Sequence, residues 1–355
     1  MSDGNGAAPR FGHGLVLGKF YPPHSGHHHL IRTAEQHCRS VTVEVIGSSV
    51  ETISVADRAA WMREIHPVVR VAATVDDTPI DFDSAAAWDA HMLTITGLLD
   101  EPVDAVFTSD AYGAELARRL DATWVRVDPD RTVNPVSGTA VRDDLAGHWS
   151  MLATPVREGL IRRVVIVGAE STGTTTLAQA LADSLGTLWV PEYGREYSAI
   201  RPGGPFAPWR TDEFDLIVER QRHAERSAAR RCPTPTLICD TDVLATAVWH
   251  ERYVGRSSPT VTAAAAQHRP LLYILTGDEI DFVDDGMRDG EHIRHDMHRR
   301  FRETLEAQTV PWMEVRGSVS ERVACALPAV QRAIEDSLRF APPLEKQSPS
   351  SRGTR

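Results

Sequence analysis

Residues 18–27 combine two histidines, a lysine and two glycines in a pattern suited to binding an anion. They follow an apolar run that predicts a short buried strand, and they lead into 30–35, which predicts a helix. The first turn of a helix favours an anion because its N–H groups are unpaired and the helix dipole is positive there. His24 and His27 lie at this junction, with Lys19 close by. The sequence therefore predicts a polyphosphate site.

Lysine is otherwise rare in this chain. Of 38 basic residues only two are lysines, Lys19 and Lys346, and the second lies in a polar C-terminal segment. A compact ammonium group is a better point charge on a triphosphate than a planar guanidinium group. The placement of Lys19 therefore supports a phosphate-binding role.

A second hydroxyl-rich segment lies at 136–142. Ser137 and Thr139 stand at the predicted start of a helix, where hydroxyl groups cap the helix and donate to phosphate oxygens. Arg142 follows about one turn later and can hold the same phosphates. Alone, this segment would indicate an ordinary helix cap. Together with the histidine-containing stretch it resembles the paired phosphate-binding elements of the nucleotidyltransferase superfamily, and that resemblance implies a phosphate clamp.

Predicted strands and helices alternate through this part of the chain. Strands are expected at 41–47, 68–72, 105–110 and 123–127, and helices at 55–64, 84–99 and 113–120. The alternation predicts a parallel sheet covered on both faces, with ligands at the carboxyl ends of its strands. His24, His27, Ser109 and Asp110 all fall at such ends.

After 151–163, which predicts a linker, the pattern starts again. A strand at 163–167 leads into a glycine-rich loop and then a helix at 177–185. This is the order of a P-loop, whose backbone N–H groups hold phosphates and whose Thr hydroxyl binds Mg²⁺, here that of Thr175. The candidate nucleotide-binding residues of the loop are Gly168, Glu170, Ser171, Thr172, Gly173, Thr174, Thr175 and Thr176.

The loop departs from the usual P-loop in one position. Thr174 stands where a lysine is expected, and this half of the chain has no lysine before the C-terminal segment. An arginine would have to supply the charge, and Arg288, in the arginine-rich stretch 288–302, is the candidate. A glycine-rich turn that binds no nucleotide is the alternative.

Two carboxylates follow the apolar stretch 236–239. Asp240 is placed to order a magnesium ion, and Asp242 is then free to act as a base on a substrate hydroxyl. The alternative is that one of the two only caps the next helix.

The segment 190–197 offers three further groups for a nucleoside. Glu192 can bind ribose hydroxyls, Tyr193 can stack on a base, and Arg195 can bind a phosphate.

The composition excludes several classes of protein. Hydrophobic residues make up 42% and charged residues 25%, and the net charge of −11 argues against general affinity for nucleic acid or anionic membranes. No apolar run approaches the ~20 residues of a membrane span, and residues 1–10 have no signal-peptide core. We therefore expect a cytoplasmic protein without nucleic-acid or membrane partners. Buried free thiols are expected at Cys38, Cys232, Cys239 and Cys325.

Several of these segments resemble one known family. The segments are 18–27, 108–113, 136–142, 168–176, 191–197 and 240–242. Together they resemble the bifunctional nicotinamide-mononucleotide adenylyltransferase / ribosylnicotinamide kinase (NadR-type) family, and the resemblance covers roughly residues 12 to 340. Longer members carry an N-terminal helix-turn-helix domain, which we do not expect here because few residues precede the first strand.

The resemblance implies an α/β fold with two domains. A Rossmann-like nucleotidyltransferase domain is expected at 13–155 and a P-loop kinase-like α/β domain at 160–340, with disordered tails at 1–12 and 341–355. The first would join ATP and nicotinamide mononucleotide to give NAD and pyrophosphate. The second would phosphorylate nicotinamide riboside, with ATP as co-substrate and Mg²⁺ held by Thr175 and Asp240.

The resemblance also implies roles for the residues of the first domain. His24 and His27 would hold the triphosphate, assisted by Lys19 within a motif that includes Gly18 and Phe20. Ser137, Thr139 and Arg142 would hold its β- and γ-phosphates. Ser109, Asp110 and Arg131 would contact the nucleotide groups.

Three interpretations stay open at this point. The chain is a two-activity enzyme, or an adenylyltransferase with a kinase-inactive nucleotide-binding C-terminal domain, or a non-catalytic sensor of NAD or ATP. The sequence does not decide between a monomer and a homo-oligomer.

Overall fold

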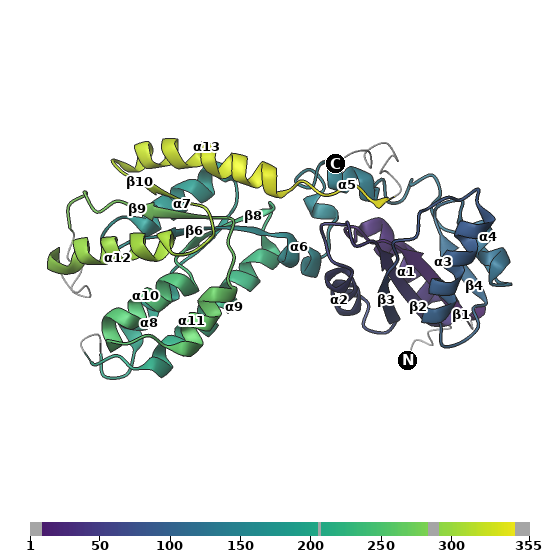
Figure 1. Ribbon diagram of the computed structural model, residues 1–355, viewed down its shortest axis with the longest axis horizontal. Coiled ribbons are helices and arrows are strands. Elements are labelled where there is room, and N and C mark those ends of the chain that lie inside the picture. Colours follow the sequence, from purple (N-terminus) through teal and green to yellow (C-terminus); the bar gives the residue numbers. More distant parts are fainter. Residues whose placement is uncertain (1–8, 205–206, 283–290, 345–355) are drawn as a thin grey trace, which may run out of the picture. The chain divides into compact units, whose positions relative to one another are not determined.

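The computed structural model describes residues 9–204, 207–282 and 291–344. Their contacts divide the chain into two compact units (Figure 1). The first comprises the described residues up to Gly159 together with the segment that starts at Arg339, and the second is Leu160–Leu338. Each unit has its own sheet and its own core, so each is described separately.

The first unit is built on a five-stranded parallel sheet in the order β3-β2-β1-β4-β5. Its strands are β1 Phe11–Gly18, β2 Cys38–Gly47, β3 Arg70–Val75, β4 Ala105–Thr108 and β5 Thr123–Arg126. The strand order reverses between β1 and β4. In such sheets ligands bind at the carboxyl ends of the strands beside this switch point.

Helices cover both faces of this sheet because its strands are apolar on both sides. On one face α1 (Ser25–His37) and α2 (Val55–Ile65) pack Ile31 and Met62 against Val43. On the other face α3 (Ala85–Leu98) and α4 (Gly113–Arg119) pack Trp88 and Leu116 into a second cluster. The unit continues through α5 (Gly138–Asp143) and the 3₁₀ turn η1 (Trp149–Met151).

The second unit has another five-stranded parallel sheet, in the order β10-β9-β6-β8-β7. Its strands are β6 Arg162–Val167, β7 Leu188–Val190, β8 Thr236–Asp240, β9 Leu272–Thr276 and β10 Trp312–Val315. β6 is central and lies between β8 and β9. The loop that follows it therefore lies at the middle of the sheet edge.

The helices of the second unit also lie on both faces of its sheet. α7 (Thr174–Leu185) and α13 (Val319–Ser337) bury Leu177, Leu181 and Val330 in one core cluster. A second cluster joins α8, α9, α10 and α11. The bounds of the other helices are α8 Tyr193–Ile200, α9 Thr211–Arg231, α10 Val243–Val254, α11 Pro259–Gln267, η2 Glu291–Ile293 and α12 Arg294–Glu306.

The α/β fold class predicted from the sequence is confirmed, but four local expectations differ from the structure. β1 begins at Phe11, inside the expected disordered tail 1–12, because Phe11 and the residues after it pair with β2. Part of the expected linker 151–163 forms α6 (Thr154–Leu160). Pro155 fits there because the first turn of a helix does not need its N–H. Cys325 is exposed, unlike the other three cysteines. Ala341, expected to start a disordered tail, makes two hydrogen bonds to the first unit.

No helix in the described part of the chain is both long and apolar enough to cross a membrane.

Candidate active sites

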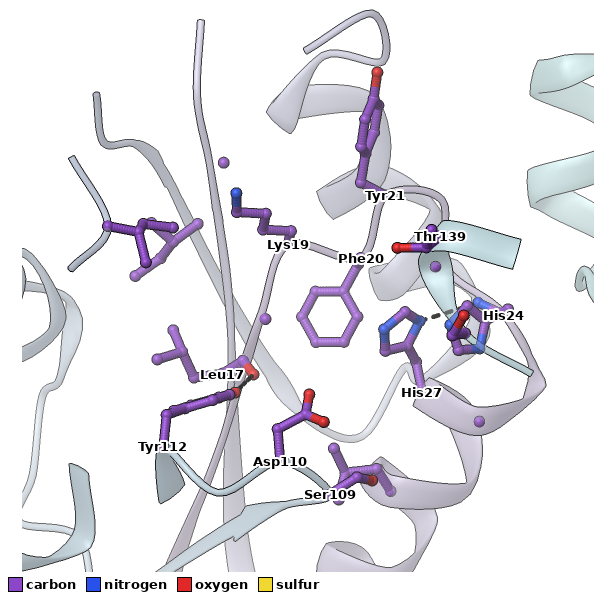
Figure 2. Close-up of a pocket in the computed structure, with 18 of the residues that line it drawn as sticks. Leu17, Lys19, Phe20, Tyr21, His24, His27, Ser109, Asp110, Tyr112 and Thr139 are labelled. Atoms are coloured by element: carbon purple, nitrogen blue, oxygen red, sulfur yellow. Dashed lines mark hydrogen bonds between the residues drawn. The ribbon is translucent and has the colours of Figure 1, made fainter. Parts of the chain in front are cut away.

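A cavity of about 730 Å³ opens at the carboxyl ends of β1 and β4 in the first unit (Figure 2). The sequence-predicted residues that line it are Gly18, Lys19, Phe20, His24, His27, Ser109, Asp110, Arg131, Ser137, Thr139 and Arg142. All the candidate residues of the first half of the chain therefore share one cavity.

The two histidines form the floor of this cavity at the start of α1. His24 is the N-cap residue of the helix, and its backbone N–H donates to Nδ1 of His27 at 3.2 Å. The two rings lie 3.7 Å apart between centroids, and the ring of Phe20 packs against that of His27 (Figure 2). Neither ring nitrogen of His24 has a hydrogen-bond partner within the described residues. His24 therefore has both nitrogens available for a ligand.

Burial and nearby arginines keep both rings neutral in the absence of a ligand. Burial, assisted by Arg131 and Arg142, lowers the pKa of His24 to about 4. Burial also lowers the pKa of His27, and the adjacent His24 adds to the effect. An anionic ligand would reverse this balance, since negative charge stabilises the imidazolium form.

Arg142 joins the helix α5 to the histidine motif. Its Nη1 donates to the backbone oxygen of Tyr21 at 2.7 Å, and its Nη2 donates to Oγ1 of Thr139 at 3.2 Å. Ser137 caps α5 by accepting a hydrogen bond from the N–H of Ala140 at 3.1 Å. Two segments far apart in the sequence therefore present their polar groups to the same cavity.

A buried ion pair holds Lys19 at the edge of the cavity. Its Nζ lies 3.6 Å from Oε1 of Glu51, and Nη1 of Arg58 lies 2.8 Å from the other oxygen of that carboxylate. Arg58 also donates to the backbone oxygen of Lys19 at 2.7 Å and is completely buried. No local sequence pattern marks Glu51 or Arg58 as part of a site.

Aromatic side chains that were not predicted from the sequence also line the cavity. Phe82, in the loop after β3, stacks on Tyr112 with ring centroids 5.9 Å apart. The ring of Trp88 lies 6.0 Å from the ring of Phe82. Nδ1 of His91 lies 2.9 Å from Oδ2 of Asp76 beside them. The signal in the sequence was a run of acidic and aromatic residues directly after a predicted strand.

Arg131 and Asp110 lie at the exposed rim. Nη2 of Arg131 donates to Oδ1 of Asp110 at 3.3 Å, and both side chains are exposed. The pair therefore borders the site without closing it.

A second cavity, of about 490 Å³, lies at the carboxyl ends of β6 and β8 in the other unit. The sequence-predicted residues that line it are Gly168, Glu170, Ser171, Gly173, Thr174, Thr175, Thr176, Glu192, Arg195 and Asp240. The loop after β6 has the backbone of a tight turn, with φ of 58° at Ser171 and 81° at Gly173. A Cβ at Gly168 would lie 2.1 Å from Oγ1 of Thr276, so this position requires glycine.

The pair of Thr175 and Asp240 links the loop to β8. Oγ1 of Thr175 donates to Oδ2 of Asp240 at 2.5 Å. Burial raises the pKa of Asp240, and hydrogen bonds from Thr175 and Thr174 oppose that shift. A hydroxyl and a carboxylate at one loop–strand junction match the oxygen ligands that Mg²⁺ prefers, with phosphate and water completing its coordination.

Three sequence-predicted residues do not line this cavity. The hydroxyl of Thr172 bonds Thr276 Oγ1 and the backbone oxygen of Ala169, both at 2.7 Å, inside the unit. The ring of Tyr193 lies 6.2 Å from that of Tyr197.

Asp242 is the third of these residues, and its carboxylate is completely buried. It caps α10 through the N–H groups of Leu244 and Ala245, and it accepts a hydrogen bond from the Tyr273 hydroxyl at 2.6 Å. All its acceptor positions face the protein, so we do not retain Asp242 as a base on a substrate.

Acidic side chains outnumber basic ones among the described residues that line the second cavity. Burial, with Asp240 nearby, raises the pKa of Glu192 to about 8, which favours its neutral form. Oε1 of Glu170 accepts from the Tyr253 hydroxyl at 3.3 Å. Arg195 is the one basic residue among the described residues that line this cavity. Arg288, our sequence-based candidate, lies outside the described residues.

Arg322, which the sequence analysis missed, supports the loop from behind. It is buried and donates to the backbone oxygens of Thr172 and Gly277, at 2.5 and 3.2 Å, and to Oε1 of Glu279 at 2.9 Å. These bonds hold the strained part of the loop against β9 and α13.

The fold and the two cavities define a protein with two nucleotide-binding α/β units, a Rossmann-like unit followed by a P-loop unit. The sequence profile of the AAA domain matches residues 163–322. The chain is 28% identical over 324 residues to the "Trifunctional NAD biosynthesis/regulator protein NadR" of Escherichia coli (strain K12), covering 85% of this chain and 78% of that protein. It is 29% identical over 297 residues to the protein of the same name from Salmonella typhimurium (strain LT2), covering 78% and 71%.

Two solved structures share the fold. A NadR protein in complex with NR is 21% identical, with a TM-score of 0.72, and covers 92% of this chain and 97% of its own. A NadR protein in complex with NAD and AMP-PNP is 20% identical, with a TM-score of 0.66, and covers 92% and 98%. The chain is homologous to the NadR proteins, as the sequence resemblance predicted.

Proposed function

We propose that the first unit transfers the adenylyl group of ATP to nicotinamide mononucleotide, giving NAD and pyrophosphate. The observation that carries this proposal is the meeting of His24, His27 and Arg142 in one cavity that also has an aromatic wall. The cavity thus offers a place for a polyphosphate and a place for an aromatic ring. NAD biosynthesis in the name of the related proteins supports the same assignment.

The residues act by position and charge. The phosphate oxygen of the mononucleotide attacks the α-phosphorus of ATP, a new P–O bond forms, and the bond to the β-phosphate oxygen breaks. Negative charge then grows on the departing pyrophosphate, where His24, His27 and Arg142 donate hydrogen bonds. No covalent intermediate with the enzyme is needed.

This proposal is tested by incubating the purified chain with ATP, Mg²⁺ and nicotinamide mononucleotide, and by measuring NAD with an alcohol dehydrogenase assay. Formation of NAD is expected. Binding of NAD or ATP without turnover would instead support a non-catalytic sensor.

We also propose that the second unit phosphorylates nicotinamide riboside with ATP. The support is the P-loop after β6, with Thr175 and Asp240 at its edge and Glu192 in the same cavity. Thr175 and Asp240 would hold a magnesium ion, which would neutralise phosphate charge when bound. Glu192, which lines the same cavity, would bind ribose hydroxyls. The solved NadR structure with NR is consistent with a riboside in this family.

Two arginines are candidates for the cation that replaces the P-loop lysine in the second unit. Arg195 lines the cavity, whereas Arg288 stays a candidate from the sequence. A chain that makes NAD but does not phosphorylate the riboside would support the kinase-inactive alternative. The assay with nicotinamide riboside and ATP, with product separated by chromatography, decides between the two.

A further inference from the structure

The segment that follows α13 lies against the first unit, beside Tyr21 of the histidine motif. We call residues 339–344 the C-terminal strap. The Tyr21 hydroxyl donates to the backbone oxygen of Ala341 at 3.0 Å, and the N–H of Ala341 donates to Oγ1 of Thr52 at 2.7 Å. The ring of Phe340 lies edge-on to that of Tyr21, at 6.0 Å between centroids. Leu344 lines the 730 Å³ cavity itself.

Tyr21 in turn holds Arg142. Its backbone oxygen accepts from Nη1 of Arg142 at 2.7 Å, and the guanidinium carbon lies 5.1 Å from its ring centroid. Arg58 lies 5.2 Å from the same ring. Besides its hydrogen bond to Thr139, Arg142 is therefore held by the backbone and the ring of Tyr21, a residue that the strap contacts.

The orientation of Tyr21 is set at its hydroxyl. Tyr21 is only 2% exposed, and its hydroxyl accepts from the N–H of Thr52 at 2.9 Å while it donates to Ala341. Without the strap, the buried O–H would lose its acceptor and the ring would lose the packing of Phe340. A buried donor without an acceptor is unfavourable, so the ring would shift and Arg142 would shift with it.

We propose that the C-terminal strap is part of the adenylyl-transfer site, with Phe340 and Ala341 as positioning residues that orient Arg142 through Tyr21. Leu344 completes one wall of the cavity. The inference rests on the proposed adenylyltransferase activity, and it assigns to that activity residues that follow the whole P-loop unit in the sequence. Arg142 holds the triphosphate in this site, so the strap acts on ATP rather than on the mononucleotide.

The test compares Tyr21→Phe, Phe340→Ala and the double variant with the wild-type chain. Tyr21→Phe keeps the ring and removes the hydroxyl, with its hydrogen bond to Ala341 in the strap and the one that it accepts from Thr52. We expect each single variant to raise the KM for ATP about tenfold, the scale of one lost buried hydrogen bond or aromatic contact, while the KM for the mononucleotide stays unchanged. Both substitutions weaken the same contact between the strap and Tyr21. The KM for ATP of the double variant should therefore be about that of the stronger single variant.

The control is Val68→Ala, an 84% exposed side chain of the same unit, which should change neither KM. Phosphorylation of nicotinamide riboside in the second unit serves as an internal control and should persist in all variants.

NAD synthesis by the wild-type chain distinguishes a failure of the proposed adenylyl transfer from a failure of the strap's proposed role. No NAD from the wild-type chain would refute the proposed function, and the strap's role with it. If the wild-type chain is active and Phe340→Ala leaves the KM for ATP unchanged, the positioning role of the strap is refuted and the proposed function is not. Equal rises in both KM values, together with a lower melting temperature, would mean that the strap only packs the unit, and would equally overturn the proposal.

Discussion

Thr175 and Asp240 are joined by a 2.5 Å hydrogen bond between the start of α7 and the end of β8. The pair brings a hydroxyl and a carboxylate to the point where the loop after β6 turns into the helix. Asp242, two residues further on, has a different environment: it is completely buried and caps α10. Of two neighbouring carboxylates at the same strand–helix junction, Asp240 therefore faces a cavity, whereas Asp242 faces the interior and caps a helix.

This difference predicts separable effects of substitution. Asp240→Asn should lower phosphorylation of nicotinamide riboside by at least roughly tenfold to a hundredfold, since even groups that only support a metal's ligands contribute on that scale. NAD formation from supplied mononucleotide should be almost unchanged, because the two units have separate cores and cavities. Steady-state assays of both reactions on the same preparation measure the two effects.

Asp242→Ala is the matched control. It should lower the melting temperature, because it removes a helix cap and leaves the Tyr273 hydroxyl without its acceptor. Equal loss of both activities in Asp240→Asn, without a change in melting temperature, would mean that one composite site carries both reactions.

Local sequence patterns predicted the two parallel sheets and the loops at their carboxyl edges. Local rules marked an anion at one helix start and a hydroxyl cap at another, but only the resemblance to a known family paired the hydroxyls and the arginine of 136–142 with His24 and His27. The capping rule left Asp240 and Asp242 undecided. Which carboxylate caps the helix depends on side-chain directions that the sequence does not specify.

The residues that the sequence analysis missed depend on tertiary contacts. Arg58 lies within a helix and Glu51 in a loop, and only folding buries these two side chains together beside Lys19. Arg322 reaches the P-loop from a helix more than a hundred residues away in the sequence. No periodicity or spacing marks a charged residue that is buried in this way, so these positions emerge only from the structure.

The two histidines of the first cavity should be required for NAD synthesis. His27→Ala should lower kcat for NAD formation by about two orders of magnitude, the usual effect of removing one preorganised donor to a developing charge. Initial rates at saturating ATP and mononucleotide measure this, with circular dichroism to show that the fold is intact. Turnover near the wild-type level in a folded variant would refute the role of the motif.

Glu44 predicts a pH dependence of stability. This residue of β2 is completely buried, neither carboxylate oxygen has a hydrogen-bond partner within the described residues, and burial raises its pKa to about 8. The folded state thus keeps a proton that the unfolded state, with an ordinary pKa near 4.5, releases. The stability of the first unit should therefore fall as the pH rises from about 5 to about 8.

Glu44→Gln tests this sign directly. The variant cannot ionise, so it should gain stability relative to the wild-type chain at pH 8 and gain less at pH 5. Urea unfolding at both pH values measures the difference. A gain that is the same at both values would show that Glu44 does not carry the pH dependence.

The last prediction concerns the cation of the P-loop unit. Arg195 lies in the cavity with Thr174, Asp240 and Glu192, and its charge lowers the pKa values of both carboxyl groups relative to burial alone. In a P-loop without lysine, the charge on the transferring phosphoryl group needs another cation. We therefore expect Arg195→Ala to lower kcat for riboside phosphorylation by about a thousandfold, the lower range for a catalytic arginine, with a smaller effect on ATP binding.

Three companion variants separate the alternatives. Thr174→Lys in the Arg195→Ala background should restore part of the lost rate, because it returns a cation to the usual P-loop position. Arg288→Ala should have a small effect if Arg195 supplies the charge, and a large one if our sequence-based candidate is right. If the wild-type chain has no kinase activity and Thr174→Lys alone creates it, the second unit is a nucleotide-binding module whose missing lysine has not been replaced. Single-turnover phosphorylation with radiolabelled ATP resolves these cases, because it reports the chemical step apart from product release.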